Sequence, residues 1–447
     1  MILRDPVHGL VAFEGDEERI VEQLMGAREV QRLRRIRQLG VTSLAFPGAE
    51  HSRFAHVVGA AFVMKLLLAR LRVIHGELPE EQRVTRDRAR EALAAAFVHD
   101  VGHGPLSHLF EDAIPGTPEH ETWTERIVLD SSTDVNRILT AVDRALPTCV
   151  VDLVHGRHPL PYLARAVSGE LDVDRCDYLL RDAHATGVRY GIYDLDWLLR
   201  SLRFAPGDGN VPASRPASDG RAGMAVLRNA PALAIDGAKG LPAIEAFITA
   251  RLFMFQQVYL HKATRAAEWM IRQILARAVW VLREGGALSS VPGGVLSAAR
   301  AVPISLGDYL ELDDGVLWGA MHAWEGARDQ ALADLCRRIR ARALFKTLEL
   351  FGEHATADGR ERALAVARDV AAVRGFDAHQ YVGLDVASVE PFGAESEPLM
   401  VVFAKGPARP LHEVSFLLSR LAGQVLSRVR LILAPELRDP VVDALGM

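Results

Sequence analysis

The pair His99-Asp100 stands at the end of an apolar stretch and could bind a metal ion. Residues 94–98 before it favour a helix, whereas the two glycines and the proline in 102–105 cannot continue one. We therefore expect both side chains in the last helical turn, where they can converge on one ion. Imidazole nitrogen with carboxylate oxygen suits Fe, Mn, Zn or Mg better than a metal that prefers thiolate. The pair could instead form a buried hydrogen bond that caps the helix, because such dipeptides are common by chance.

Two residues from other parts of the chain could complete a metal site. A single ion needs several ligands from separated segments, with positions left open for water and substrate. His56 lies near the start of a predicted apolar helix, 57–71, and Asp174 lies on a later predicted helix. Together with His99 and Asp100, they could supply four ligands to one divalent ion.

The elements around these residues are expected to be mostly helical. Spacings of four place Asp174, Tyr178 and Asp182 on one polar stripe of a helix that leucines flank. Residues 203–223 are rich in Pro, Gly, Ser and Asp, which predicts a loop. Other segments with helical spacing are 17–25, 30–39, the alanine-rich run that ends at His99, 159–166 and 241–282.

Strands are predicted in only a few places. A small hairpin is expected around 10–13, and short strands are expected at 224–227 and 232–235. The C-terminal part combines a helix at 364–372, strands at 397–403 and 429–433, and an amphipathic helix at 414–426. The predicted fold class is therefore mainly α, with a helical core over residues 1–345 and a small α+β lobe over 346–447.

The composition is that of an ordinary globular protein. The chain has 447 residues, of which 49% are hydrophobic and 24% charged, enough for one large domain and a smaller one. A net charge of −5 indicates no broad surface for nucleic acid. Cys149, Cys176 and Cys336 are an odd number without a CxxC pair, so we expect buried reduced thiols and no disulfide framework.

No targeting or membrane segment is expected. The N-terminal residues 1–6 lack a basic region followed by an apolar core, and no stretch approaches the ~18 apolar residues of a membrane span. A cytoplasmic location without membrane contact is the default expectation.

Several motifs occur in the order found in one enzyme family. The pattern His…His-Asp…Asp resembles the HD-domain metal-dependent phosphohydrolases. Over roughly the first two-thirds of the chain, further motifs resemble the deoxynucleoside triphosphate triphosphohydrolases of the SAM-and-HD-domain type. We expect no SAM domain in front, and an HD motif region at about 50–182. The motifs are Asp5-Pro6-Val7-His8-Gly9, Gln31-Arg32-Leu33-Arg34, Gln38-Leu39-Gly40, Phe46-Pro47-Gly48-Ala49, Arg53-Phe54-Ala55-His56 and Asp172-Val173-Asp174-Arg175.

The resemblance implies hydrolysis of a deoxynucleoside triphosphate at the α-phosphorus, which releases deoxynucleoside and intact triphosphate. One divalent transition metal, Fe, Mn, Zn or similar, would be held by His56, His99, Asp100 and Asp174, with Mg²⁺ as a further ion on the substrate phosphates. A bound ion would lower the pKa of its water and neutralise phosphate charge.

The resemblance also implies roles for other histidines. His120 matches the proton donor to the leaving 5′ oxygen, and Glu111 matches its acidic partner, where the family usually has aspartate. His103 and His108 match histidines that face the substrate phosphates. For each lone histidine, a hydrogen-bonded core residue is the alternative.

The remaining predicted site residues would bind phosphates or select the sugar. An apolar wall against C2′ would disfavour a ribose hydroxyl. Core packing and surface salt bridges are the alternative roles for these side chains. Candidates for the phosphates are Arg53, Arg175, which stands where relatives often have lysine, Arg251 and Lys262. Residues that match the sugar site are Gln38, Leu39, Tyr178, Asp182 and Tyr259.

Regulation and rival functions stay open at this point. Some relatives are activated by guanine nucleotides between subunits, but Gly26 occupies the position of a required aspartate, which argues against guanine-specific activation. Gln31, Arg34 and Lys239 are retained, so another nucleotide activator is possible, and we expect a homo-oligomer, dimer or tetramer. The alternatives are an HD phosphohydrolase acting on a ribonucleotide, monophosphate or dinucleotide, and a non-catalytic nucleotide sensor.

Overall fold

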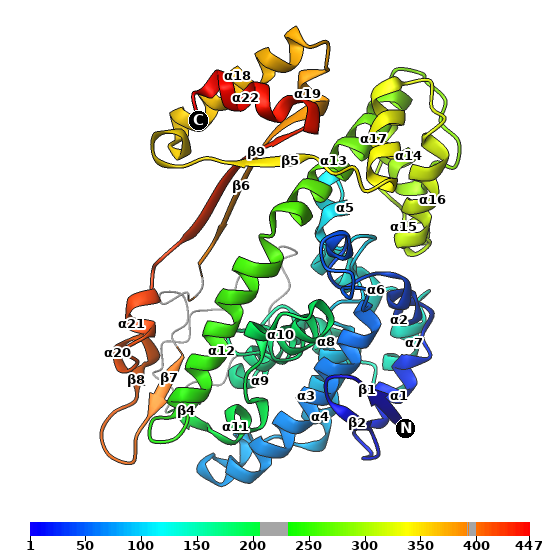
Figure 1. Cartoon of the computed structure of the whole chain (residues 1–447). Coiled ribbons are helices and arrows are strands. Elements are labelled where there is room, and N and C mark those ends of the chain that lie inside the picture. The colour runs from blue at the N-terminus through cyan, green and yellow to red at the C-terminus, as the bar shows by residue number, and fades with distance from the viewer. Residues whose placement is uncertain (206–230, 391, 393–398) are drawn as a thin grey trace.

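The computed structural model describes residues 1–205, 231–390, 392 and 399–447. Helices dominate this part of the chain, and three small sheets accompany them (Figure 1). The mainly α fold with a small α+β region confirms the predicted fold class. Within the described residues, no helix has both the length and the apolarity needed to cross a bilayer.

The body at the bottom of Figure 1 contains the first hydrophobic core. A hairpin of β1 (Ile2–Asp5) and β2 (Gly9–Ala12) opens the chain, as predicted. The helices of this body are α1 (Arg19–Met25), α2 (Arg28–Arg32), α3 (Arg53–Ile74), α4 (Arg86–Val98), α6 (His120–Leu129), α7 (Asp134–Val142), α8 (Leu146–Val154), α9 (Pro161–Val167), α10 (Val173–Thr186), α11 (Leu195–Arg200) and α12 (Leu241–Met254).

Helices α3, α4 and α10 form the centre of the body, because α3 packs against both of the others. Each starts at a residue whose side-chain oxygen accepts a hydrogen bond from a backbone N–H of the first turn: Ser52, Thr85 and Asp172, respectively. Such caps fix where a helix begins. His56 and Asp174 thereby lie in the first turns of α3 and α10, while His99 ends α4.

The second hydrophobic core surrounds α13 (Lys262–Arg283), which runs from the body to the upper part of the molecule (Figure 1). The predicted continuous helix 241–282 is wrong at one point. Residues 255–259 form a π-helical turn, and His261 has an extended conformation that separates α12 from α13. The other helices of this core are α5 (His108–Ala113), α14 (Gly293–Ala299), α15 (Leu306–Leu310), α16 (Asp314–Trp324) and α17 (Gln330–Arg340).

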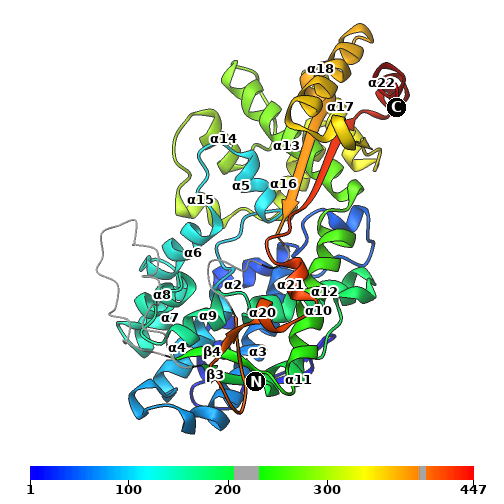
Figure 2. The same ribbon diagram turned by 90° about the vertical axis from the view of Figure 1, so that its left-hand side faces the viewer.

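The C-terminal lobe has an antiparallel sheet in the order β5 (Lys346–Glu349), β9 (Leu426–Leu433), β6 (Val382–Val389). Helices α18 (Ala357–Val373), α19 (Ala378–Tyr381) and α22 (Arg438–Leu445) accompany this sheet. Figures 1 and 2 both show its long strands running from these helices down towards the body. The second core continues across residue 345, and the predicted domain boundary there stays a prediction.

Between β6 and β9 the chain returns to the body. A four-stranded sheet has the order β3 (Leu202–Ala205), β4 (Ala232–Asp236), β7 (Met400–Val402), β8 (Arg409–Pro410). The predicted helix 414–426 is wrong. Two short helices, α20 (Leu411–Val414) and α21 (Leu418–Leu421), stand there instead, because Ser415 and Ala422 are extended and Gly423 has a φ of +68°.

Two smaller predictions are wrong in part, and a third falls on residues that the structure does not describe. The expected strand at 224–227 lies outside the described residues. The predicted helix 30–39 stops early, since α2 passes into a 3₁₀ turn over 33–35 and Ile36 is extended. All three cysteines are free, but only Cys176 and Cys336 are buried, whereas Cys149 is half-buried.

Candidate metal centre and adjoining cavity

The helix ends bring three of the predicted metal ligands together. His56 Nε2 lies 3.3 Å from His99 Nε2 and 2.9 Å from Asp174 Oδ1. His99 Nε2 lies 3.6 Å from the same Asp174 oxygen. Asp100 borders the group, with Oδ1 3.4 Å from His99 Nε2 and Oδ2 3.7 Å from His56 Nε2.

These separations fit one divalent ion. Ligand atoms about 2.1 Å from an ion lie roughly 3.0–3.4 Å apart at right or tetrahedral angles. The ring nitrogens that face away are occupied: His56 Nδ1 lies 2.8 Å from Asp177 Oδ2, and His99 Nδ1 lies 2.9 Å from the Ala96 carbonyl oxygen. Acceptors at Nδ1 leave each Nε2 lone pair free for a metal. The donor set is therefore compatible with a divalent metal site.

The raised pKa of His56 also fits a cation site. Burial alone would lower its pKa, but the hydrogen bonds and charges of Asp174 and Asp177 outweigh burial and raise the pKa of His56 to about 10. So strongly negative surroundings stabilise positive charge at this point. A divalent cation is the kind of ligand that such surroundings hold.

Asp177 belongs to a buried ion-pair group that supports His56. Its Oδ1 lies 2.7 Å from His8 Nε2, and it accepts two hydrogen bonds from Arg181, which also donates one to Asp5. Gly59 on α3 makes room for this group. A Cβ at Gly59 would lie 1.9 Å from Asp177 Oδ1 and 2.3 Å from Arg181 Nη2.

Asp100 connects Arg53 to the candidate metal cluster, which consists of His56, His99 and Asp174. Buried Arg53 pairs with Asp100 Oδ2 and donates two hydrogen bonds to Ser107 Oγ. Burial would raise the pKa of Asp100, but Arg53, His99 and His103 hold it well below its usual value. Asp100 is thus a carboxylate that both a metal and Arg53 could share.

Ser107 lies in a strained segment at the start of α5. Leu106 and Ser107 have positive φ values of 56° and 61°, which side chains rarely adopt. Asp314 accepts a hydrogen bond from the Leu106 backbone N–H, 2.7 Å long, and helps to hold this conformation. Strain of this kind is concentrated at functional sites.

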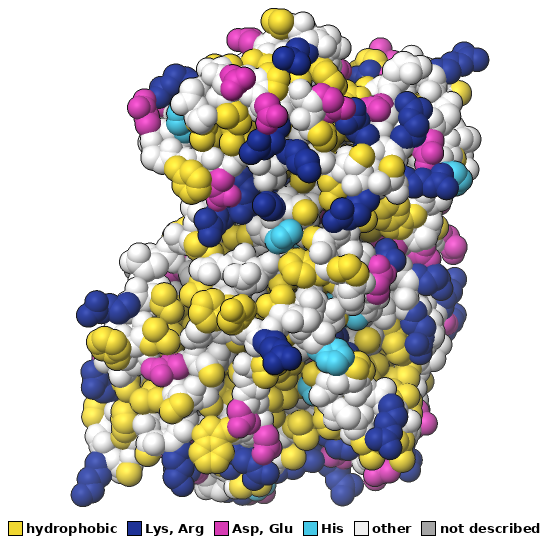
Figure 3. Space-filling view, viewed as in Figure 1, with side chains coloured by type: hydrophobic (Ala, Val, Ile, Leu, Met, Phe, Trp, Pro, Cys, Tyr) yellow, Lys and Arg dark blue, Asp and Glu magenta, His cyan; other side chains and the backbone are white. Residues whose placement is uncertain are grey.

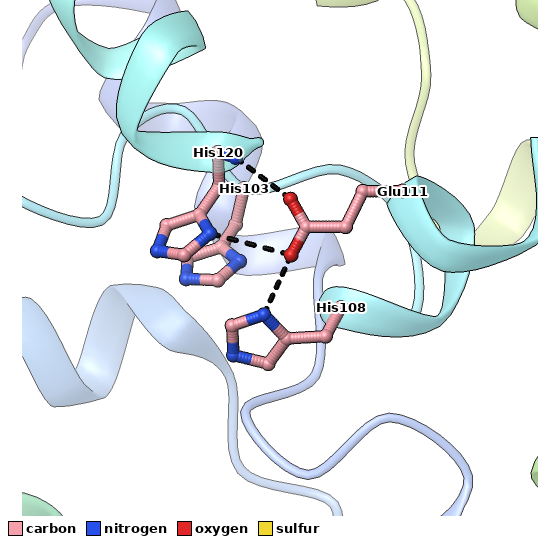
Figure 4. Close-up of side chains that lie close together, drawn as sticks. All are labelled: His103, His108, Glu111 and His120. Atoms are coloured by element: carbon pink, nitrogen blue, oxygen red, sulfur yellow. Dashed lines mark hydrogen bonds and ion pairs between the residues drawn. The ribbon is translucent and has the colours of Figure 1, made fainter. Parts of the chain in front are cut away.

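A second cluster adjoins the first and contains His103, His108, Glu111 and His120 (Figure 4). Glu111 Oε1 lies 2.6 Å from His108 Nδ1 and 3.3 Å from His120 Nδ1, and its other oxygen accepts from the His120 backbone N–H at 2.7 Å. The His103 and His120 rings stack with centroids 3.8 Å apart. His103 Nε2 lies 3.2 Å from Asp100 Oδ1, so this histidine connects the two clusters.

The charges in this second cluster are well defined at two positions. Burial would raise the pKa of Glu111, but the hydrogen bonds of His108 and His120 lower it strongly, so Glu111 is a carboxylate. Burial, with Arg53 nearby, lowers the pKa of His103 well below its usual value. His103 is therefore a neutral imidazole between Asp100 and His120.

A cavity of about 220 Å³ lies beside the clusters. Ser107 and His108 line it, together with three of the predicted sugar residues: Gln38, Leu39 and Tyr259. The other two predicted sugar residues are on α10. The Tyr259 hydroxyl donates a 2.7 Å hydrogen bond to Asp182 on that helix, and the Tyr178 ring packs edge-on against Tyr259.

The predicted phosphate ligands are less tightly grouped. Arg53 is engaged with Asp100 and Ser107, as described. Arg175 turns back onto Asp172 and the Gly169 carbonyl, and Arg251 donates to Glu170 Oε2 at 3.0 Å. Each of these contacts would have to be exchanged or shared for the arginine to bind phosphate.

Lys262 lies apart from the other predicted ligands. It lines a separate cavity of about 300 Å³ that also contains Arg342, Lys346 and Arg438. Figure 3 shows Lys and Arg side chains gathered where the upper lobe meets the body. This cavity is therefore basic, whereas the one beside the metal cluster has charges of both signs.

Several residues of the site escaped prediction. His51 Nε2 lies 2.8 Å from Asp182 Oδ1, and Ser107 accepts from Arg53. Asp177 and Arg181 could have been noticed, because they follow Asp174 by three and seven residues on the same helix. His8 belongs to the motif Asp5-Pro6-Val7-His8-Gly9, but nothing in that motif indicates the contact with Asp177.

Known proteins are similar to this chain. The HD domain family model matches residues 53–182. The uncharacterised protein YwfO of Bacillus subtilis is 32% identical over 430 residues, which cover 95% of this chain and 89% of YwfO. The deoxynucleoside triphosphate triphosphohydrolase SAMHD1 of Homo sapiens is 28% identical over 218 residues, which cover 42% of this chain and 34% of SAMHD1.

A solved structure extends this similarity to the fold. A phosphohydrolase from Bacteroides thetaiotaomicron matches with a TM-score of 0.78 at 26% identity, over 97% of this chain and 99% of that one. The segment 53–182 that matches the family model contains His56, His99, Asp100 and Asp174. The resemblance noted in the sequence is confirmed. The chain therefore belongs to the HD-domain phosphohydrolase family.

Proposed function

We propose that this protein is a metal-dependent deoxynucleoside triphosphate triphosphohydrolase, which releases deoxynucleoside and triphosphate. The main support is the cavity that contains Gln38, Leu39 and Tyr259, because Ser107 in its lining is bonded to Arg53, which pairs with the predicted ligand Asp100. A sugar in this cavity would place its α-phosphate near the metal cluster. The similarity to SAMHD1 supports the same substrate class.

The residues of the metal cluster would hold one divalent transition ion. When bound, such an ion supplies an acidified water and neutralises charge on the phosphate oxygens. In the reaction, a bond forms between the water oxygen and the α-phosphorus, and the bond from that phosphorus to O5′ breaks. The triphosphate keeps both of its anhydride bonds.

The leaving 5′ oxygen needs a proton, which we assign to His120. Glu111 holds the His120 ring through Nδ1 at 3.3 Å and its backbone through the N–H at 2.7 Å. An acceptor at Nδ1 leaves Nε2 to deliver the proton. Stacking on neutral His103 fixes the plane of the ring. Positioned acid catalysis of this kind contributes typically ~10²–10⁴-fold.

Sugar selection is assigned to Leu39 and Tyr259. Leu39 offers an apolar side chain, and the Tyr259 hydroxyl is already committed to Asp182 at 2.7 Å. A 2′ hydroxyl placed against the Leu39 side chain and the Tyr259 ring would lose water without gaining a partner. The Gln38 Oε1 atom is buried without a partner among the described residues and could accept from the 3′ hydroxyl.

Nucleotide activation and oligomer formation belong to the same proposal. The basic cavity of Lys262, Arg342, Lys346 and Arg438 fits an anionic effector better than the substrate cavity does. The expected activator residue Arg34 is at the surface, where it donates to Gln31 at 2.8 Å. We expect a homo-oligomer in which a nucleotide could join these surfaces.

The test is product identification. Purified protein is incubated with each deoxy- and ribonucleoside triphosphate, with deoxynucleoside monophosphates and with dinucleotides, under Fe, Mn, Zn and Mg. Mass spectrometry should find deoxynucleoside and inorganic triphosphate. Pyrophosphate with monophosphate, or turnover of another nucleotide class alone, would favour a different phosphohydrolase. Binding without any turnover would favour a nucleotide sensor.

A further inference from the structure

The cavity beside the metal cluster extends along one face of α13. Besides the predicted sugar residues, it is lined by Thr264, Arg265, Glu268 and Arg272 of this helix and by Asp112 of α5. Two guanidinium groups thus stand with two carboxylates. Such a balanced lining suits a neutral polar group that both donates and accepts hydrogen bonds, and it does not suit a polyphosphate.

Two buried oxygen atoms in the lining of the cavity need a ligand. Gln38 Oε1 and Thr264 Oγ1 are buried and have no hydrogen-bond partner in the described part of the chain. Thr264 is 1% exposed, so its hydroxyl cannot turn out to bulk water. Buried polar groups are nearly always paired, which indicates that a polar molecule completes this cavity.

The charged residues of α13 present a defined pattern of donors and acceptors. Glu268 uses Oε2 for a 2.8 Å hydrogen bond from Arg265, and the same oxygen lies 3.8 Å from Arg272 Nη2. Glu268 Oε1 has no hydrogen bond to the described residues. Arg272 Nε is likewise buried without a partner in that part of the chain. A free acceptor therefore lies next to a guanidinium that can still donate.

Two strands of the C-terminal lobe contact Arg265 and the turn before α13. Asp385 of β6 accepts hydrogen bonds of 3.1 and 2.6 Å from Arg265. Its partner in the sheet, Arg430 of β9, donates a 2.9 Å hydrogen bond to the Leu260 carbonyl, next to Tyr259. Arg265 and the turn before α13 are thus fixed by two buried residues of the sheet, so the α13 side chains are preorganised for one ligand.

We propose that the α13 wall reads the nucleobase of the substrate and selects guanine, with Glu268 and Arg272 as the specificity-determining residues. Guanine alone has two adjacent donors on its pairing edge, N1–H and N2–H, which one carboxylate can accept together. Its O6 acceptor lies beside them, where Arg272 can donate. Adenine and cytosine present a donor beside an acceptor, and thymine presents one donor between two acceptors. This inference rests on the proposed function, because it assumes that the sugar occupies the neighbouring part of the cavity.

The first experiment uses the unmodified protein and two nearly identical substrates. Deoxyinosine triphosphate, dITP, differs from dGTP only by the absence of the 2-amino group. If Glu268 accepts from that group, kcat/KM for dITP should be roughly ten- to a hundredfold below that for dGTP, with dATP, dCTP and dTTP no better than dITP. Equal use of dGTP and dITP, or preference for another base, would overturn the proposal.

Variants then locate the effect. Glu268→Gln keeps the shape but loses one acceptor, so the ratio of dGTP to dITP should fall towards one. Asp329→Asn is the matched control, because it also replaces a carboxylate by an amide. Asp329 pairs at 2.7 Å with Arg277, which lies on α13 like Glu268, but Asp329 does not line the cavity. It should keep the wild-type ratio. An unchanged ratio in Glu268→Gln would reject the assignment.

The outcomes also separate this inference from the proposed function. If no deoxynucleoside triphosphate is hydrolysed under any metal, the proposed function fails. If all four deoxynucleoside triphosphates are hydrolysed with the same efficiency, the proposed function stands and guanine selection by Glu268 and Arg272 is rejected. If Glu268→Gln does not fold, the comparison of dGTP with dITP in the unmodified protein still decides.

Discussion

Replacement of Tyr259 tests whether Leu39 and Tyr259 exclude a ribose 2′ hydroxyl from the cavity. The Tyr259 ring lines the cavity beside Leu39, and its hydroxyl donates 2.7 Å to Asp182 Oδ2. Asp182 is 1% exposed and has its other oxygen 2.8 Å from His51 Nε2. The ring is therefore anchored at one end and cannot move aside freely for a larger sugar.

The expected selectivity follows from this geometry. A ribose 2′ hydroxyl against Leu39 and the Tyr259 ring would be buried without a partner, which costs ~1–3 kcal/mol. That cost corresponds to a preference of roughly ten- to a hundredfold for deoxynucleotides, since 1.4 kcal/mol is tenfold. Tyr259→Phe keeps the ring and should keep most of this preference. Tyr259→Ala removes the ring and should lose it.

The assay compares kcat/KM for matched ribo- and deoxynucleoside triphosphates with the same metal. Tyr162→Phe is the control, because Tyr162 is a buried tyrosine whose hydroxyl donates 2.7 Å to the Gln82 carbonyl and which does not line the cavity. Equal efficiency for both sugars in the wild type would refute the wall. Loss of selectivity in Tyr259→Phe would show that the anchor to Asp182, and not the ring, excludes ribose.

Three further predictions concern the clusters. His120→Ala should lose ~10²–10⁴-fold in turnover while keeping its metal, and an unchanged rate would remove His120 from the mechanism. Gly59→Ala should displace Asp177 and Arg181, and should thereby lower the free energy of unfolding by ~1–3 kcal/mol and reduce the metal content. Thermal denaturation and metal analysis measure these two effects. Gly319→Ala is the control, because its Cβ would meet nothing within 4 Å, and it should change neither the stability nor the metal content. The pKa of His56 is raised to about 10, and a metal binds only the neutral ring, so metal uptake must displace a proton from His56. In competition with a chelator, the apparent metal affinity should therefore rise with pH through the neutral range, by up to about tenfold per pH unit. A metal affinity independent of pH would contradict this.

The positions of His56, His99 and Asp174 along their helices could be predicted because their signals are local. Ser52 and Asp172 cap α3 and α10, which places His56 and Asp174 in first turns, and the glycines and proline after His99 end α4. The pairing of strands 232–236 and 400–402 could not be predicted, because it joins segments far apart in the sequence.

The supporting residues were harder to find for a related physical reason. His8 and Asp177 are separated by 169 positions, and Arg265 and Asp385 by 120. Neither contact leaves a periodic pattern in the sequence. Lys262 is a predicted phosphate ligand but lines a different cavity from Tyr259, since the extended conformation of His261 between them turns the chain.

The most direct test of the proposed reaction is hydrolysis of a deoxynucleoside triphosphate in water labelled with ¹⁸O. Attack at the α-phosphorus predicts one labelled oxygen in the released triphosphate and none in the deoxynucleoside, and Asp174→Ala should abolish both metal binding and product. Label in the 5′ hydroxyl of the nucleoside, release of labelled monophosphate, or full activity in Asp174→Ala would contradict the account.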